Sequence, residues 1–164
     1  MVLLHLSVWA QVPLQEAFGE PVQTIELKQK GVEKIKADTE GNLFLLSPSQ
    51  HRLHKLFRVN QYDSVLTVGG KGIEREAFNY PVKVEAPNRQ SVYVLDYYNR
   101  RLLILNTNLK VVGEVNFLTL QERLAGEQVD GFMPFTFTVG PTGDLYLFNQ
   151  DNYKVYKYSV EGRV

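Results

Sequence analysis

The chain has 164 residues, of which 44% are hydrophobic and 12% aromatic, so it can bury a core and lacks the composition of a disordered segment. Its 18 basic and 18 acidic residues give zero net charge, so no overall field favours nucleic acid or an anionic membrane. It has no cysteine, which excludes disulfides, thiolate metal sites and cysteine nucleophiles.

The first ten residues, MVLLHLSVWA, are a short apolar run followed by Gln11. Small or modest residues before Gln11 look like a secretory cleavage site, although the run has no Lys or Arg at its start. Two alternatives stand: a signal-peptide remnant, which predicts an exported, periplasmic or cell-surface protein, and an ordinary strand or tail. The run is far shorter than the about 20 apolar residues that span a bilayer, so no transmembrane helix is expected.

Residues 11–32 form an N-terminal segment, in which Val22 to Lys28 (VQTIELK) is predicted to be an outer strand of another structural unit or a latching strand. Beyond it, similar apolar stretches begin at Leu43 (LFLL), Val92 (VYVL) and Leu145 (LYLF), 49 and 53 residues apart. The match extends outward without gaps and includes Ile35 with Val84 and Phe137, Arg52 with Arg101 and Lys154, and Leu53 with Leu102 and Val155. Three copies of one repeat are therefore predicted.

Each repeat is predicted to be a sheet of up to four short strands joined by polar turns, at 33–68, 82–115 and 134–164. The expected strands are Glu33–Ala37, Asn42–Leu46, Arg52–Phe57, Ser64–Val68, Val82–Ala86, Ser91–Leu95, Leu102–Asn106, Lys110–Val115, Phe135–Val139, Asp144–Phe148 and Tyr153–Tyr158. The segment 116–133 is an insertion, in which Leu118 to Leu124 is predicted to be helical. Strand order predicts that this insertion and the turn Asp96 to Arg101 lie on one rim.

The stretch 69–105 contains a Gly-rich lead-in, a Phe-x-x-Pro step and an Asp-x-x-Asn-x-Arg turn between two apolar strands. These features are Gly69, Gly70, Gly72, Phe78, Pro81, Asp96, Asn99 and Arg101. Their order resembles an NHL repeat, one blade of a six-bladed β-propeller. The resemblance implies an all-β fold of four-stranded antiparallel blades. Because propellers close with about four to eight blades, three repeats predict an incomplete ring, so the chain is expected to be a fragment or to self-associate through open blade edges.

The turn residues Asp96, Asn99 and Arg101, with Asn152 in the third repeat, are interpreted as structural. Asp and Asn side chains shape turns by bonding nearby backbone, and Arg101 is expected to pair with a carboxylate of a neighbouring repeat. Ligand contact is the alternative interpretation. The first repeat departs from the motif, because Ser47 stands at the Asp position.

Tyr97, Tyr98 and Arg100 are not required by the turn, and they combine stacking faces with a cation. His51 and Tyr153 occupy the position of Arg100 in the other two repeats. These five residues are the candidate binding residues of the rim, and solvated loop side chains are the alternative. Some NHL propellers bind RNA, so single-stranded RNA is a further candidate ligand.

Polar residues also alternate with apolar ones on the expected inner strands. Lys34 aligns with Lys83 and Thr136, and Lys36 aligns with Glu85 and Thr138. Period-two alternation places them on one side of each strand, where they are expected to pair across blades or to approach a central channel. Propellers resembling lactonases hold calcium with several acidic and amide groups, but only Glu85 and Asp38 lie in or beside these strands.

The sequence predicts no catalytic residue, metal site or cofactor. His5, His51 and His54 show no metal-ligand spacing, and the chain has no Gly-x-Ser-x-Gly elbow or phosphate loop. The sequence thus favours a non-catalytic binding or scaffold module that presents the rim to a protein, peptide or glycan. The alternatives are part of a metal-dependent propeller hydrolase or lyase, and a single-stranded RNA-binding NHL domain.

Overall fold

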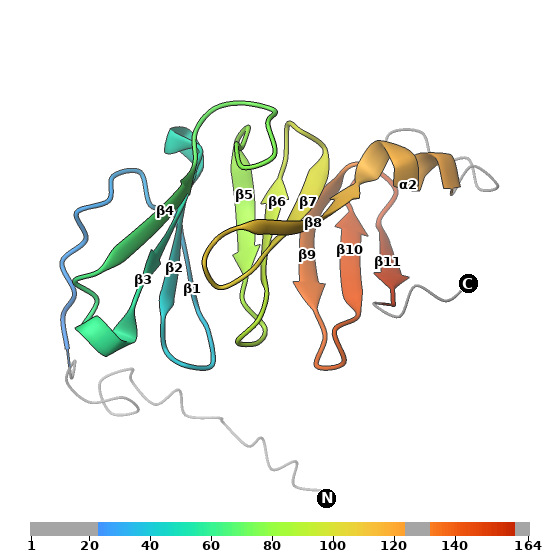
Figure 1. The fold of residues 1–164 in the computed structure, drawn as a ribbon. Helices are drawn as coiled ribbons and strands as arrows, with labels where there is room; N and C mark the ends of the chain where they lie inside the picture. The colour runs from blue at the N-terminus through green and yellow to red at the C-terminus, as the bar shows by residue number, and fades with distance from the viewer. Residues whose placement is uncertain (1–22, 124–131, 160–164) are drawn as a thin grey trace, which may run out of the picture.

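The computed structural model describes residues 23–123 and 132–159, which form three antiparallel sheets (Figure 1). In each sheet every strand pairs with the next strand of the chain. Blade 1 contains β1 (Lys34–Ala37), β2 (Leu43–Ser47), β3 (Arg52–Leu56) and β4 (Val65–Gly69). Blade 2 contains β5 (Pro81–Glu85), β6 (Val92–Asp96), β7 (Arg101–Leu105) and β8 (Val111–Asn116). Blade 3 contains β9 (Pro134–Val139), β10 (Leu145–Asn149) and β11 (Lys154–Tyr158).

All eleven expected strands are confirmed, with ends shifted by at most one residue. The turns between the first two strands of each blade differ in chemistry. Gly41 and Gly143 adopt positive φ in blades 1 and 3. In blade 2 the side chain of Asn88 accepts hydrogen bonds from the backbone N–H groups of Gln90 and Ser91. An Asx turn therefore does in blade 2 what glycine does in the other two blades.

The backbone also confirms the repeat alignment. His51, Arg100 and Tyr153, which align in sequence, have φ of 55°, 52° and 55°. Each lies in the turn between the second and third strand of its blade. Few residues other than glycine adopt this left-handed conformation, so the shared value shows that the three turns have the same geometry.

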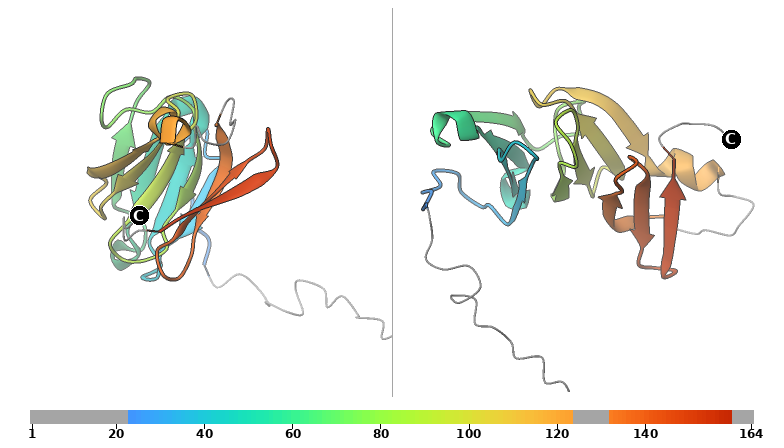
Figure 2. Two further views of the ribbon diagram at one scale, coloured as in Figure 1. Left: turned by 90° about the vertical axis from the view of Figure 1, so that its right-hand side faces the viewer. Right: turned by 90° about the horizontal axis from the view of Figure 1, so that it is seen from below.

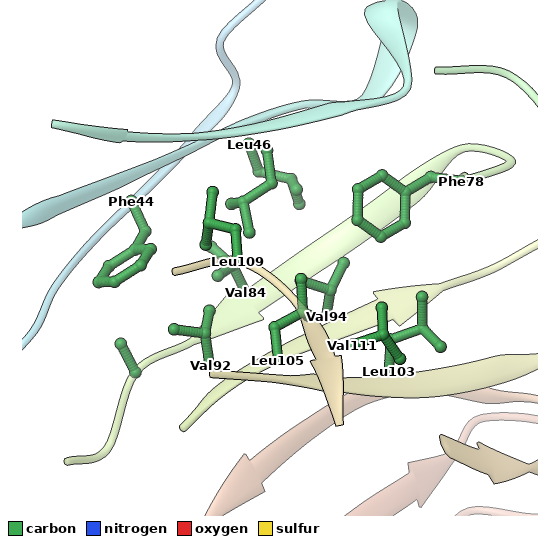
Figure 3. Packing of buried hydrophobic residues seen from close by; sticks show 12 residues of the cluster. Phe44, Leu46, Phe78, Val84, Val92, Val94, Leu103, Leu105, Leu109 and Val111 are labelled. Atoms are coloured by element: carbon green, nitrogen blue, oxygen red, sulfur yellow. The ribbon is translucent and has the colours of Figure 1, made fainter. Parts of the chain in front are cut away.

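The sheets lie side by side in chain order, and the core lies between them (Figures 1 and 2). Between blades 1 and 2, Phe44 and Leu46 pack against a larger set of blade 2 side chains that includes Val84, Val94 and Leu105 (Figure 3). A second buried cluster joins blades 2 and 3. It contains Leu95, Leu102, Phe117, Phe132, Phe137, Leu145 and Leu147. Each inter-blade interface is thus a small hydrophobic core.

The insertion forms α2 (Phe117–Arg123), which confirms the predicted helix and begins one residue earlier; Leu124 lies outside the described residues. The backbone N–H of Phe117 donates to the carbonyl of Arg100 at 2.9 Å. In Figure 1, α2, the β6–β7 turn and the 3-10 helix η1 (Pro48–Gln50) lie at the same upper edge. The predicted common rim is therefore confirmed. A second 3-10 helix, η2 (Arg58–Asn60), lies at the opposite edge.

Residues 23–32 contain no strand, so residues 23–28 do not form the expected outer or latching strand in this structure. The possible signal remnant at residues 1–10 lies outside the described residues. Within 23–123 and 132–159, no helix has the length and apolar composition needed to cross a membrane.

Candidate functional site: an inner-strand cleft with an aromatic rim

The Asp96 turn of blade 2 is a buried polar network. The Asp96 carboxylate, which is fully buried, accepts hydrogen bonds from the Asn79 backbone N–H, from Asn99 Nδ2 at 2.7 Å and from Arg101 Nε at 2.9 Å. The Arg101 guanidinium also donates to the backbone carbonyls of Glu74 and Ala77. The network fixes the link between blades 1 and 2 to the β6–β7 turn.

The expected pairing of Arg101 with a carboxylate of a neighbouring repeat is wrong. Its carboxylate partners are Asp96 and Glu114, both in blade 2, at 2.9 and 3.3 Å. The physical reason is register, because Arg101 directly opposes Asp96 across the hairpin. In blade 3, Asn152 shapes the equivalent turn: its side chain accepts from the Lys154 backbone N–H and donates to the Tyr156 hydroxyl.

A cleft of about 710 Å³ lies along the inner strands β1, β5 and β9. Its size is within the range of about 300 to 1,000 Å³ that is typical of small-molecule sites. Apolar side chains form part of the lining, and charged or hydroxyl side chains form the rest. The lining residues are Glu33, Lys34, Ile35, Lys36, Pro48, Tyr80, Val82, Lys83, Val84, Glu85, Phe135 and Thr136.

Polar contacts cross the blades within this cleft. The Glu85 carboxylate forms an ion pair with Lys36 of blade 1 at 2.7 Å and another with Lys83 at 3.3 Å. The Lys83 ammonium also donates to the Thr136 hydroxyl of blade 3 at 3.2 Å. The predicted pairing across blades is therefore confirmed. Two ammonium groups share the one carboxylate of Glu85, which is largely buried, so these contacts leave an excess of positive charge.

Four aromatic residues form a connected group, two of which line the cleft. Tyr80 and Phe135 line it. Tyr98 and Tyr97 connect these two rings in the order Tyr80, Tyr98, Tyr97, Phe135. The ring centroids are 5.5 Å apart between Tyr80 and Tyr98, 5.5 Å between Tyr98 and Tyr97, and 6.4 Å between Tyr97 and Phe135. Tyr80, Tyr98 and Phe135 are exposed to solvent. We call these four residues the aromatic row.

Tyr80 has an unusual backbone. Its φ is 60°, which is rare for a bulky residue. The equivalent residue of the first repeat is Gly31, whose φ is 68°. The fold thus uses a left-handed residue at this position twice, and in the second repeat it places a large ring there. The Tyr80 N–H donates to His51 Nδ1 at 2.9 Å, which helps to hold the ring in place.

The structure gives the five predicted rim residues different environments. Tyr97 and Tyr98 belong to the aromatic row, and His51 supports it. Arg100 instead donates to Gln121 of α2 and to the Phe132 carbonyl, so it attaches the insertion to blade 2. Tyr153 is 81% exposed in blade 3 and is not among the residues that line the cleft.

Sequence reasoning missed Tyr80 and Phe135. Neither belongs to a turn motif, and the two are brought together only because β5 and β9 are neighbours. One signal was present in the sequence: in the repeat alignment, Tyr80 stands opposite Gly31, in a position where glycine suits a left-handed backbone.

His54 and Asp38, which lie outside the cleft lining, have hydrogen-bond partners close to them in blade 1. His54, on β3, hydrogen-bonds Thr67, and its burial, followed by the charge of Arg52, lowers the pKa of its imidazole below 6.5. The Asp38 carboxylate accepts from the backbone N–H groups of Glu40 and Asn42. Within the described residues, no three His, Asp or Glu side chains are grouped to hold a metal ion.

Sequence comparison assigns no family, because no family model and no curated protein matches the chain. Solved structures do match in fold. A catalytically inactive virginiamycin B lyase from Staphylococcus aureus, crystallised with quinupristin, has a TM-score of 0.53 and 10% identity over 84% of this chain and 44% of its own. A streptogramin B lyase has a TM-score of 0.50 and 13% identity over 82% of this chain and 43% of its own.

A protein of unknown function from Bacteroides caccae has a TM-score of 0.51 and 15% identity, over 79% of this chain and 46% of its own. The chain thus spans less than half the length of each of these structures. At such low identity the likeness shows the fold alone. Together with the three antiparallel sheets, it shows that the chain is an all-β protein built of β-propeller blades.

Proposed function

We propose that this chain is a non-catalytic binding module whose ligand lies in the inner-strand cleft, against the aromatic row. The observation that carries the proposal is Tyr80. The left-handed backbone, which Tyr80 shares with His51, Arg100 and Tyr153, presents its ring to solvent. Of these four residues, only Tyr80 lines the 710 Å³ cleft.

The other groups of the cleft support binding rather than bond chemistry. Lys36, Lys83 and Glu85 neutralise one another in part, and Thr136 accepts from Lys83. In the contact between Lys83 and the Thr136 hydroxyl, the lysine is an ion-paired donor rather than a general base. The arrangement supplies ring faces, hydroxyls and charges in fixed positions, which is what recognition of a ligand requires.

Tyr80→Gly gives a sharp test, because it removes the ring and keeps the backbone conformation that Gly31 shows in the first repeat. Relief of the left-handed strain, about 1 kcal/mol or more, offsets the lost ring contact with Tyr98, about 0.5 to 1.5 kcal/mol. We expect unchanged stability and lost binding, in a screen of the full chain against glycan and peptide arrays with quantitation by calorimetry.

The matched control is Tyr153→Gly, since Tyr153 is also a tyrosine at positive φ and lies outside the cleft. It is expected to keep full binding. Binding that survives in Tyr80→Gly and is lost in Tyr153→Gly would move the site away from the cleft.

We also propose that the blades are NHL-like repeats of a six-bladed ring. Either further blades or a second copy of this chain would complete the ring, and light scattering distinguishes the two because only self-association gives a dimer. Export is tested by N-terminal sequencing of the mature protein.

A second candidate function is that of the two lyases whose likeness to this chain is of fold alone. If the chain is part of a metal-dependent lyase or hydrolase, turnover will depend on divalent cations. Single-stranded RNA binding, the third alternative, would weaken steeply with salt because phosphate contacts release counterions.

A further inference from the structure

The side chains that line the cleft have a net charge of about +1. Its lining contains three ammonium groups, those of Lys34, Lys36 and Lys83, against two carboxylates, those of Glu33 and Glu85. Lys36 and Lys83 share Glu85. Lys34 lies two residues before Lys36 on β1, so the pleat places both side chains on the same face. Within the described residues Lys34 has no ion-pair partner.

An excess of one charge suits a ligand with one anionic group at this position. A strand of phosphates would need several cations that track its backbone. Here the carboxylates of Glu33 and Glu85, in the same lining, would repel successive phosphates. A ligand with a single carboxylate avoids this repulsion, and Glu85 can keep its 2.7 Å ion pair with Lys36.

The aromatic row adds a second requirement. Tyr80 and Phe135 line the cleft, Tyr97 and Tyr98 connect them, and Tyr80, Tyr98 and Phe135 are exposed to solvent. A ligand that uses them has flat apolar faces repeated along its length. The hydroxyl of Thr136 and the carboxylate of Glu85 lie in the same cleft and can hydrogen-bond hydroxyl groups. A chain of sugar rings has both features, an apolar C–H face and a polar edge on each ring.

We infer that the cleft binds an acidic glycan, in which a uronic acid carboxylate faces Lys83 and Lys34 while neighbouring sugar rings lie on the aromatic row. This inference rests on the proposed function and specifies its ligand. Lys83 is then the specificity-determining residue for the acid, and Tyr80 supports acidic and neutral sugars alike.

The test compares a galactotriose in which one ring is replaced by galacturonic acid with galactotriose itself, by isothermal titration calorimetry on the full chain. We expect the acid to bind at least about tenfold more tightly. Lys83→Gln is expected to remove most of that preference, because it weakens binding of the acid far more than binding of galactotriose. Tyr80→Gly is expected to weaken both. The control is Lys110→Gln, which removes an exposed lysine paired with Glu76, away from the cleft.

Each other outcome has a defined meaning. Equal affinity for the two sugars, with no effect of Lys83→Gln, would overturn the acidic specificity and retain the proposed function. Failure of both sugars, with Tyr80-dependent binding of an oligouridylate or an acidic peptide, would overturn the glycan inference alone. Absence of Tyr80-dependent binding to any of these probes would overturn both proposals.

Discussion

The middle blade and the two outer blades of the structure contain the same repeat positions in different surroundings. Val84 of blade 2 faces blade 1 and is 5% exposed, whereas Ile35, its equivalent in blade 1, is 61% exposed. Leu102 of blade 2 is fully buried in the interface with blade 3, whereas Val155, its equivalent in blade 3, is 63% exposed. The burial of a repeat position therefore depends on whether a neighbouring blade covers it.

Ile35, Val155 and Tyr80 all expose apolar surface, but for different reasons. Ile35 and Val155 have buried counterparts in the middle blade. Tyr80 belongs to the middle blade itself, and its equivalents are Gly31, with the same backbone conformation, and Met133, which is half-buried. Exposure of Ile35 and Val155 thus follows from the repeat architecture, and the exposed ring of Tyr80 does not.

The largest effect is expected when the buried ion pair of the middle blade is broken. Asp96→Asn leaves the Arg101 guanidinium without its buried carboxylate partner, which should lower the free energy of unfolding by about 3 to 5 kcal/mol. Urea denaturation followed by circular dichroism measures this. In blade 3 the equivalent residue is already Asn149, and Asn149→Ser, which gives the residue of blade 1, should change the stability by about 1 kcal/mol or less.

If Asp96→Asn and Asn149→Ser were equally mild, the buried network would not stabilise the middle blade in the way described. Equal severity would mean that the two turns are energetically equivalent despite their different partners.

Truncation of one repeat position in two blades tests the role of the neighbouring sheet. Leu102→Ala should lower the free energy of unfolding by about 2 to 5 kcal/mol, because it leaves a cavity between blades 2 and 3. Val155→Ala should change it by about 0.5 kcal/mol or less, as at exposed surface sites. The same urea titrations measure both variants. Similar losses would show that the outer face of blade 3 is covered in solution.

A smaller effect is expected from the pH dependence of His54. Burial and the charge of Arg52 lower the pKa of the folded-state imidazole below 6.5, so the unfolded chain binds a proton more readily. The corresponding stability is fully present above about pH 6.5 and is lost as the pH falls through the lowered pKa. His54→Gln should therefore flatten the fall of the urea midpoint between about pH 7.5 and 5. An unchanged slope would mean that His54 is not responsible.

Much of the fold could be predicted from the sequence, because repeats and period-two alternation are local signals. The eleven strands, the helix after Asn116 and the shared rim follow from them. The exposure of Ile35 and Val155 could not be predicted in this way, since both match core positions in the alignment. Whether a neighbouring blade covers a position is a property of the assembly, which no local pattern contains.

The candidate site was predictable only in part. Tyr97 and Tyr98 stand out because the turn does not require them, and they do belong to the aromatic row. Arg100 has the same signal, but α2 and Phe132 provide its hydrogen-bond partners. Phe135 lies on β9, 55 residues after Tyr80, and contacts between blades bring it to the same cleft.

The most direct test of the cleft as the binding site is an amide NMR titration of the full chain with a galactotriose in which one ring is replaced by galacturonic acid. We predict that chemical shifts change at the amides of Tyr80, Lys83, Tyr98 and Phe135, and that those of β4 and β11, the last strands of their sheets, stay constant. Changes confined to β4 or β11, or no change at any concentration, would contradict the assignment of the binding site to the cleft.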